Sequence, residues 1–147
     1  MTRFSSGHAG APQQAGVIAV RRDGHGFEVC LIRRKASRRW GIPKGMVDPG
    51  DTHEETALNE AWEEAGLKGQ LIGDALGTFE YEKWNHDLVV AVYLMEVTET
   101  YDYYEEAHFR DRTWWSLTEA AAKLAKHPVL PLLEDARTRL EKIHRRA

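Results

Sequence analysis

The sequence predicts an α/β fold in which a β-sheet lies between layers of helices. Apolar and β-branched runs at residues 15–22 and 27–34 are typical of strands. A third run, residues 88–97, is apolar on both alternating faces, which indicates a central strand covered on both sides. Helix-start signals occur between and after these runs, and strands mixed with a few helices indicate a layered sandwich.

In chain order, residues 1–14 of the 147-residue sequence are small and polar, and we expect a flexible N-terminal arm there. We expect residues 15–147 to form a single domain. Asp-Gly-His-Gly at 23–26 predicts a hairpin between the first two strands. Two further strands are expected at 77–84 and 112–117.

The first helix is predicted to follow Thr52. Thr52 and Glu55 form the Thr-x-x-Glu pattern of a capping box, and Gly66 is suited to end the helix. An apolar stripe at helical spacing gives this helix a packing face, formed by Ala57, Leu58, Ala61 and Ala65. The helix is therefore expected to dock on the sheet through this stripe.

Two more helices are predicted near the C-terminal end of the sequence. The first follows Leu117, with Thr118 as its expected cap. The second follows Pro128 or Pro131 and contains the segment Leu-Leu-Glu-Asp-Ala-Arg-Thr-Arg-Leu-Glu-Lys-Ile-His. With the first helix, they supply the helical part of the predicted sandwich.

The charges are unevenly distributed, although the formal net charge is only −3. Residues 1–45 carry nine Lys or Arg against two acids, whereas residues 46–106 carry sixteen acids against two lysines. This asymmetry favours a metal site beside an anion site, and it argues against duplex nucleic acid as the main partner. Solvated charges without a site are the alternative on this evidence.

The bulk composition is that of a soluble globular protein, with 42 % hydrophobic and 29 % charged residues. No apolar run approaches membrane-spanning length, and the first residues lack the plan of a signal peptide. The single cysteine, Cys30, lies in an apolar run and is expected in the core. We therefore expect a cytoplasmic protein with no membrane partner.

Three glutamates of the first predicted helix share one face. Glu63 and Glu64 lie three and four residues after Glu60, so the three carboxylates are neighbours on the helix surface. Hard divalent cations such as Mg²⁺ prefer oxygen ligands, and the loop before the helix adds Lys44, which could meet a phosphate. A solvated helix face is the alternative interpretation, and the wider spacing of the motif decides against it.

That spacing resembles the Nudix box, which reads Gly, five residues, Glu, seven residues, Arg-Glu-hydrophobic-any-Glu-Glu-any-Gly-hydrophobic. Gly45 opens the pattern, Asp51 stands at the position of the first Glu, and Asn59 stands at the position of the Arg. The remaining positions follow in order as Glu60, Ala61, Trp62, Glu63, Glu64, Ala65, Gly66 and Leu67. The resemblance covers roughly residues 15–135 and implies a Nudix-type α/β/α sandwich with a mixed sheet.

Two branches of the family share features with this chain. Arg-Arg-Trp-Gly-Ile-Pro-Lys-Gly, which ends at Gly45, is similar to the entry to the box in enzymes of dinucleoside polyphosphates. The segments at 63–81, 92–106 and 112–124 are more similar to the diphosphoinositol polyphosphate phosphohydrolases. The resemblance implies a hydrolase that cleaves a phosphoanhydride bond in a polyphosphorylated small molecule of one of these two types.

The resemblance also implies roles for particular residues. The implied metal ligands are Glu60, Glu63, Glu64 and the backbone carbonyl of Lys44, with Mg²⁺ as the cofactor and Mn²⁺ as an alternative. The implied catalytic positions are Glu63, Glu64, Asp51 and Asn59. The expected substrate-binding residues are Arg33, Arg34, Lys35, Arg38, Arg39, Lys44 and Gly45, because a polyphosphate needs several cations. Glu105 and Glu106 are later-loop candidates for the general base.

Two departures from the box leave alternatives open. Asp51 is one methylene shorter than Glu, and Asn59 removes a permanent positive charge from beside three carboxylates. Either the enzyme is slower than its relatives or another arginine fills the role. The alternatives are a nucleoside triphosphate pyrophosphohydrolase acting on modified nucleotides and a catalytically weakened binding or sensor protein. A monomer and a homodimer are both compatible with the sequence.

Overall fold

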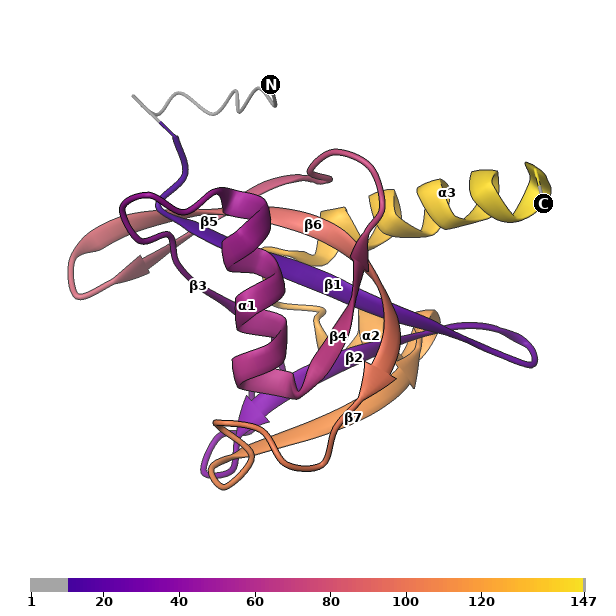
Figure 1. Cartoon of the computed structure of the whole chain (residues 1–147), viewed down its shortest axis with the longest axis horizontal. Helices are drawn as coiled ribbons and strands as arrows, with labels where there is room; N and C mark the ends of the chain where they lie inside the picture. The colour runs from indigo at the N-terminus through magenta and orange to yellow at the C-terminus, as the bar shows by residue number, and fades with distance from the viewer. Residues whose placement is uncertain (1–10, 147) are drawn as a thin grey trace.

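The computed structural model describes residues 11–146 of the chain, and Figure 1 shows their arrangement. The strands are β1 (Gln14–Asp23), β2 (Gly26–Arg34), β3 (Lys44–Met46), β4 (Leu67–Leu71), β5 (Gly77–Lys83), β6 (His86–Thr100) and β7 (Arg110–Ser116). The helices are α1 (His53–Ala65), α2 (Leu117–Lys123) and α3 (Leu130–Arg146). None of these helices is long and apolar enough to cross a membrane.

The seven strands form one mixed sheet. Its order is β4-β6-β1-β2-β7, with β3 added beside β1 and β5 added beside β6. β1 and β6 run parallel, whereas the other strand pairs are antiparallel. β6 pairs with β1, β4 and β5, so the predicted central strand at residues 88–97 is confirmed and is longer than expected.

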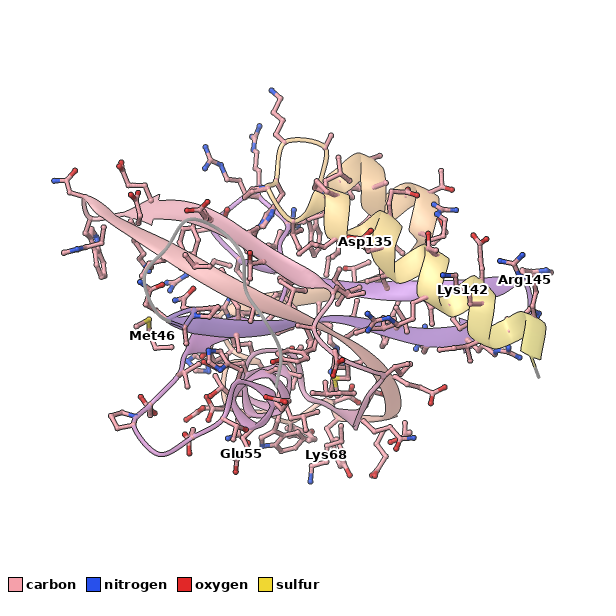
Figure 2. All side chains as sticks on the ribbon, turned by 90° about the horizontal axis from the view of Figure 1, so that it is seen from above. Met46, Glu55, Lys68, Asp135, Lys142 and Arg145 are labelled. Carbon is pink, nitrogen blue, oxygen red and sulfur yellow. The ribbon has the colours of Figure 1, made fainter. Side chains whose placement is uncertain are left out.

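Helices cover both faces of the sheet, as Figure 2 shows: α1 lies on one side and α3 on the other. The core beneath α3 is built from large apolar side chains such as Leu94 and Leu133, both 1 % exposed or less. The core beneath α1 contains many small residues, namely Ala15, Ala19, Ala57, Ala61, Ala65 and Ala91. Because the alanines have short side chains, the backbone of α1 lies close to the sheet.

Three details differ from the sequence-based expectations. β3 lies in the segment expected as a loop before the helix, and β4 was not predicted. Both strands are short, contain glycine and carry no alternating pattern, and they are defined here by pairing with β1 and β6. The cap of α2 is Ser116 and not Thr118, since the Ser116 hydroxyl accepts the Glu119 amide and the Glu119 carboxylate accepts the Ser116 amide. Most of the predicted arm lies outside the described residues, but its last residue, Gln14, begins β1.

Candidate active site

The first turn of α1 forms as the sequence predicts. The Thr52 hydroxyl accepts the Glu55 amide at 3.0 Å, and the Glu55 carboxylate accepts the Thr52 amide at 2.9 Å. Gly66 ends the helix in the left-handed conformation, with φ 66°. Between these caps, the buried Ala57, Ala61 and Ala65 hold the helix against β1 and β3. This packing places Glu60 and Glu64 next to β3.

Glu64 is the most buried of these glutamates, with 9 % of its surface exposed. Its Oε1 accepts the backbone N–H of Lys44 at 2.9 Å, and its Oε2 lies 3.2 Å from Nη2 of Arg110. Burial raises the pKa of Glu64 to about 7, while the Lys44 amide and the Arg110 guanidinium act in the opposite direction. A buried carboxylate with two donors is thus fixed between α1, β3 and β7.

Glu60 lies directly over Gly45. A Cβ atom on Gly45 would stand 1.5 Å from Oε1 of Glu60, so only glycine leaves room for this carboxylate. Burial raises the pKa of Glu60 to about 8, and the negative charges of Glu64 and Glu63 add to the shift. Gly45, which was expected to bind substrate, therefore has at least the role of leaving space for the Glu60 carboxylate.

A fourth carboxylate comes from the loop between β6 and β7. The backbone N–H of Glu106 donates to the carbonyl of Glu63 at 3.0 Å, and its carboxylate pairs with Nε of Arg110. Its charge acts on both Glu60 and Glu64, where it favours the protonated forms. Glu105, the other later-loop candidate, is exposed. The structure thus brings Glu106 to the cluster and leaves Glu105 in solvent.

Arg110 is a residue of this cluster that sequence reasoning missed. It connects Glu64 on α1 with Glu106 in the loop, and its side chain is only 14 % exposed. The only local signal was its position four residues after Glu106, a spacing at which opposite charges meet on a helical turn. Its contact with Glu64 spans 46 residues of sequence and depends on the position of β7 in the sheet.

The two positions that depart from the box do not join the cluster. Asp51 and Asn59 are both exposed. The Asp51 backbone amide donates to the carbonyl of Asp48 at 3.0 Å, in the turn before α1. The side chains of Asp51 and Asn59 make no hydrogen bond or ion pair with any residue in 11–146. Their predicted catalytic roles stay predictions.

The predicted group of basic substrate-binding residues is divided. Arg33 stacks on Trp40 at 4.5 Å and pairs with Asp111, whereas Arg34 lies over Phe109, next to the strand position of Arg110. Since successive residues of a strand point to opposite faces, Arg33 and Arg34 serve different sides of the sheet. Arg34, Lys35, Arg38 and Arg39 are exposed. Arg33 therefore lies on the other side of the sheet from Arg34, and its expected role in substrate binding stays a prediction.

The backbone and the side chain of Lys44 contact different parts of the structure. Its backbone amide binds Glu64, but its Nζ donates to the Tyr81 hydroxyl at 2.9 Å, and that hydroxyl donates to Gln14 at 2.8 Å. His127 lies close by, and its pKa is lowered by burial and by the positive charge of Lys44. The backbone of Lys44 thus lies at the carboxylate cluster, while its ammonium group is held by β5.

The donor set fits a divalent cation in its chemistry. In residues 11–146 no three His, Cys, Asp or Glu side chains stand together as a ready metal site. However, the carboxyl groups of Glu60 and Glu64 are neighbours with raised pKa values, and the absence of a side chain at Gly45 leaves space for Glu60. Carboxylate oxygens are the preferred ligands of Mg²⁺ and Mn²⁺. Each oxygen of Glu64 already has one partner, and each keeps a second lone pair that could bind a cation.

The sheet between helices and the acidic helix after β3 define the class of protein that the box residues implied. A family model for the NUDIX domain matches residues 12–135, and the chain therefore belongs to the Nudix family. The crystal structure of a C. elegans Ap4A hydrolase binary complex superposes with a TM-score of 0.78 over 90 % of this chain and 99 % of that chain. At 23 % identity this match establishes the fold, and it confirms the predicted Nudix-type α/β/α sandwich with a mixed sheet.

Curated relatives share more of the sequence. Nudix hydrolase 21, chloroplastic, of Arabidopsis thaliana is 35 % identical over 118 residues, which are 76 % of this chain and 59 % of that protein. Diphosphoinositol polyphosphate phosphohydrolase 2 of Rattus norvegicus is 29 % identical over 120 residues, which are 80 % of this chain and 65 % of that protein. The chain thus spans less than two thirds of the length of these relatives.

Proposed function

We propose that this protein is a divalent-metal-dependent Nudix hydrolase that cleaves a phosphoanhydride bond in a polyphosphorylated small molecule. The observation that carries the proposal is the pair of partly buried carboxylates Glu60 and Glu64 on α1, with Glu106 held next to Glu64 through their shared partner Arg110. Such a concentration of partly buried negative charge has a clear purpose if it holds a cation against phosphate.

In this proposal Glu60 and Glu64 are the main metal ligands, with Glu63 and the carbonyl of Lys44 as further oxygens. The cation, when bound, neutralises the phosphate oxygens on which charge builds during in-line attack by water. Glu106 is the favoured general base, because it reaches the cluster from a loop and its carboxylate is held by one arginine. It would accept the proton of the attacking water.

The substrate is proposed to carry several phosphates. Arg34, Lys35, Arg38 and Arg39 are exposed cations at the end of β2 and in the following turn, and Arg34 lies beside the strand position of Arg110. Exposed cations next to a metal site suit a chain of phosphates better than a single diphosphate. The relatives' names support two substrate types, dinucleoside polyphosphates and diphosphoinositol polyphosphates.

The test is product release from a panel of candidate substrates with Mg²⁺ and, in parallel, with Mn²⁺. The panel contains diadenosine polyphosphates, an inositol pyrophosphate, ADP-ribose and nucleoside triphosphates. Glu64→Gln is the inactive control, and Glu141→Gln on the exposed face of α3 is the matched control. Turnover of the first two substrates, lost only in Glu64→Gln, supports the proposal and identifies the substrate.

Other outcomes point to the alternatives. Preferential turnover of nucleoside triphosphates would favour the nucleotide pyrophosphohydrolase. No turnover with a cation still bound would favour the weakened sensor, which the exposed, uncontacted Asn59 and Asp51 motivate. The cytoplasmic location and the choice between monomer and homodimer stay predictions.

A further inference from the structure

The carboxylate cluster lacks the positive charge that the Nudix box places next to it. Asn59 occupies that position and is exposed, and its side chain makes no hydrogen bond in the described range 11–146. Carboxylates that are buried side by side repel one another, and an opposite charge within about 4–6 Å is needed to keep them ionised. A positive charge from elsewhere in the chain would offset this repulsion.

Arg110 has the geometry of such a counter-ion. Its Nη2 lies 3.2 Å from Oε2 of Glu64, and its Nε pairs with the carboxylate of Glu106. The side chains of Glu64, Glu106 and Arg110 are 12 %, 21 % and 14 % exposed, so solvent screens these pairs less than surface pairs. A guanidinium has a planar fork that can serve two carboxylates at once.

Position 59 could not serve the same carboxylates. It lies five residues before Glu64, which places the two side chains about 140° apart around the helix axis. An arginine at position 59 would instead face Glu63, four residues further on. In this chain the positive charge is therefore that of Arg110. It lies on the other side of the cluster, where it meets Glu64 and the loop residue Glu106.

We infer that Arg110 is a positioning residue, the counter-ion that holds Glu64 and Glu106 together until a divalent cation takes over part of that charge. The inference rests on the proposed function, because it requires that the cluster bind a cation. Arg110 and the cation compete for the same negative charge, so removing Arg110 makes the cluster less stable alone and more receptive to the cation.

The experiment compares the melting temperature with chelator and with saturating Mn²⁺, and takes the difference as the cation increment. We expect a positive increment in the parent and an increment about 3–6 °C larger in Arg110→Gln, which corresponds to cation binding about tenfold tighter. Arg110→Lys keeps the charge and should retain an increment near that of the parent.

Arg112→Gln is the matched control. Arg112 lies two residues further along β7, but its Nη1 donates to the carbonyls of Ala65 and Tyr101, both at 2.7 Å, and so closes the end of α1. Its loss should lower both melting temperatures and leave the cation increment unchanged. A structural role of Arg110 alone would give the same pattern as this control.

A double variant keeps the test valid if Arg110→Gln does not fold. Glu106→Gln alone removes one negative charge and should reduce the cation increment, whereas Glu106→Gln combined with Arg110→Gln should restore it to about the parent value. Equal increments with and without Arg110, in either background, would overturn the inference. Absence of any increment in the parent would overturn the proposed metal site itself, and with it the inference.

Discussion

The two faces of the sheet are covered by helices of different construction. Beneath α3 the core consists mainly of large apolar side chains, such as Leu94, Leu132 and Leu133. Beneath α1 the core contains many alanines, and the glutamates Glu60 and Glu64 lie on the same helix as three of them. The α3 face therefore buries larger apolar side chains, whereas the small side chains of the α1 face let that helix lie close to β3.

That close approach is what makes a carboxylate site possible. Glu64 reaches the amide of Lys44 at 2.9 Å, and Glu60 occupies the space above Gly45. Longer apolar side chains in place of the alanines would separate α1 from β3 and remove both contacts. The comparison predicts that changes on the α1 face affect chemistry first, and that changes on the α3 face affect stability first.

The largest effect is expected at the general base. Glu106→Gln should lower kcat by about 10²–10⁴-fold, because a positioned carboxylate no longer takes a proton from water. Its neighbour Glu105 is exposed, so Glu105→Gln should leave kcat within about twofold of the parent. Steady-state kinetics with the best substrate of the panel make the comparison. Equal losses in both variants would remove Glu106 from the mechanism.

On the α3 face, Leu133→Ala should reduce the free energy of unfolding by about 2–5 kcal/mol. Leu133 is 1 % exposed and packs in the large-residue core, so its truncation leaves a cavity there. Turnover per folded molecule should stay near that of the parent, since the cavity is on the far side of the sheet from the carboxylates. Urea denaturation and kinetics on the same sample test both parts, and a large loss of turnover would break the comparison.

Gly45→Ala should act in the opposite way. The new methyl group would meet the flexible end of Glu60 and not the backbone, so the fold should persist while the carboxylate moves away. We expect kcat/KM to fall about 10–100-fold, as for a displaced metal ligand, with a change of less than about 1 kcal/mol in stability. Ala added at Gly24, where a Cβ meets nothing within 4 Å, is the matched control.

The cluster should also make stability depend on pH. Burial raises the pKa of Glu60 to about 8 and that of Glu64 to about 7, both from an ordinary value of 4.5. Between pH 4.5 and the raised values, the folded protein keeps protons that the unfolded chain has lost. The stability from these groups is therefore fully present below about pH 4.5 and is lost as the pH rises to 8.

Melting temperatures measured with chelator from pH 5 to 8 test this dependence. Glu60→Gln resembles the protonated form at all pH values, so its melting temperature should fall less with rising pH than that of the parent. Parallel curves for the two proteins would show that Glu60 does not titrate in this range.

The smallest effect is expected at Arg33. Its partners are Trp40 and Asp111, and it points away from the face of Arg34. Arg33→Gln should therefore change KM by less than about threefold and stability by less than about 1 kcal/mol. Arg34→Gln, by contrast, should raise KM for a polyphosphate. A rise in KM in both variants would show that Arg33 also binds the substrate, as expected from the sequence.

The acidic helix was predictable because its signals are local. The capping box, the alanine stripe and the spacing of Glu60, Glu63 and Glu64 all lie between Thr52 and Gly66. The strands at 15–22, 27–34 and 77–84 were predictable for the same reason, since each carries its own pattern. What the sequence predicts well is what neighbouring residues decide.

The remaining features depend on register between distant segments. Arg110 meets Glu64 only because β7 pairs with β2 so that Arg110 lies opposite Arg34. The separation of Arg33 from Arg34, by contrast, follows from side-chain alternation within the strand expected at 27–34, which continues to residue 34 in the structure. The contact of Arg110 is set by the sheet as a whole.

The central claim is that the carboxylates of the α1 face bind a divalent cation. The most direct measurement is equilibrium binding of Mn²⁺ to metal-free protein, followed by electron paramagnetic resonance of the free ion. The parent should bind Mn²⁺ saturably, Mg²⁺ should compete, and Glu60→Gln combined with Glu64→Gln should abolish the binding while the circular dichroism spectrum stays unchanged. Saturable binding of equal affinity in the folded double variant would contradict the account.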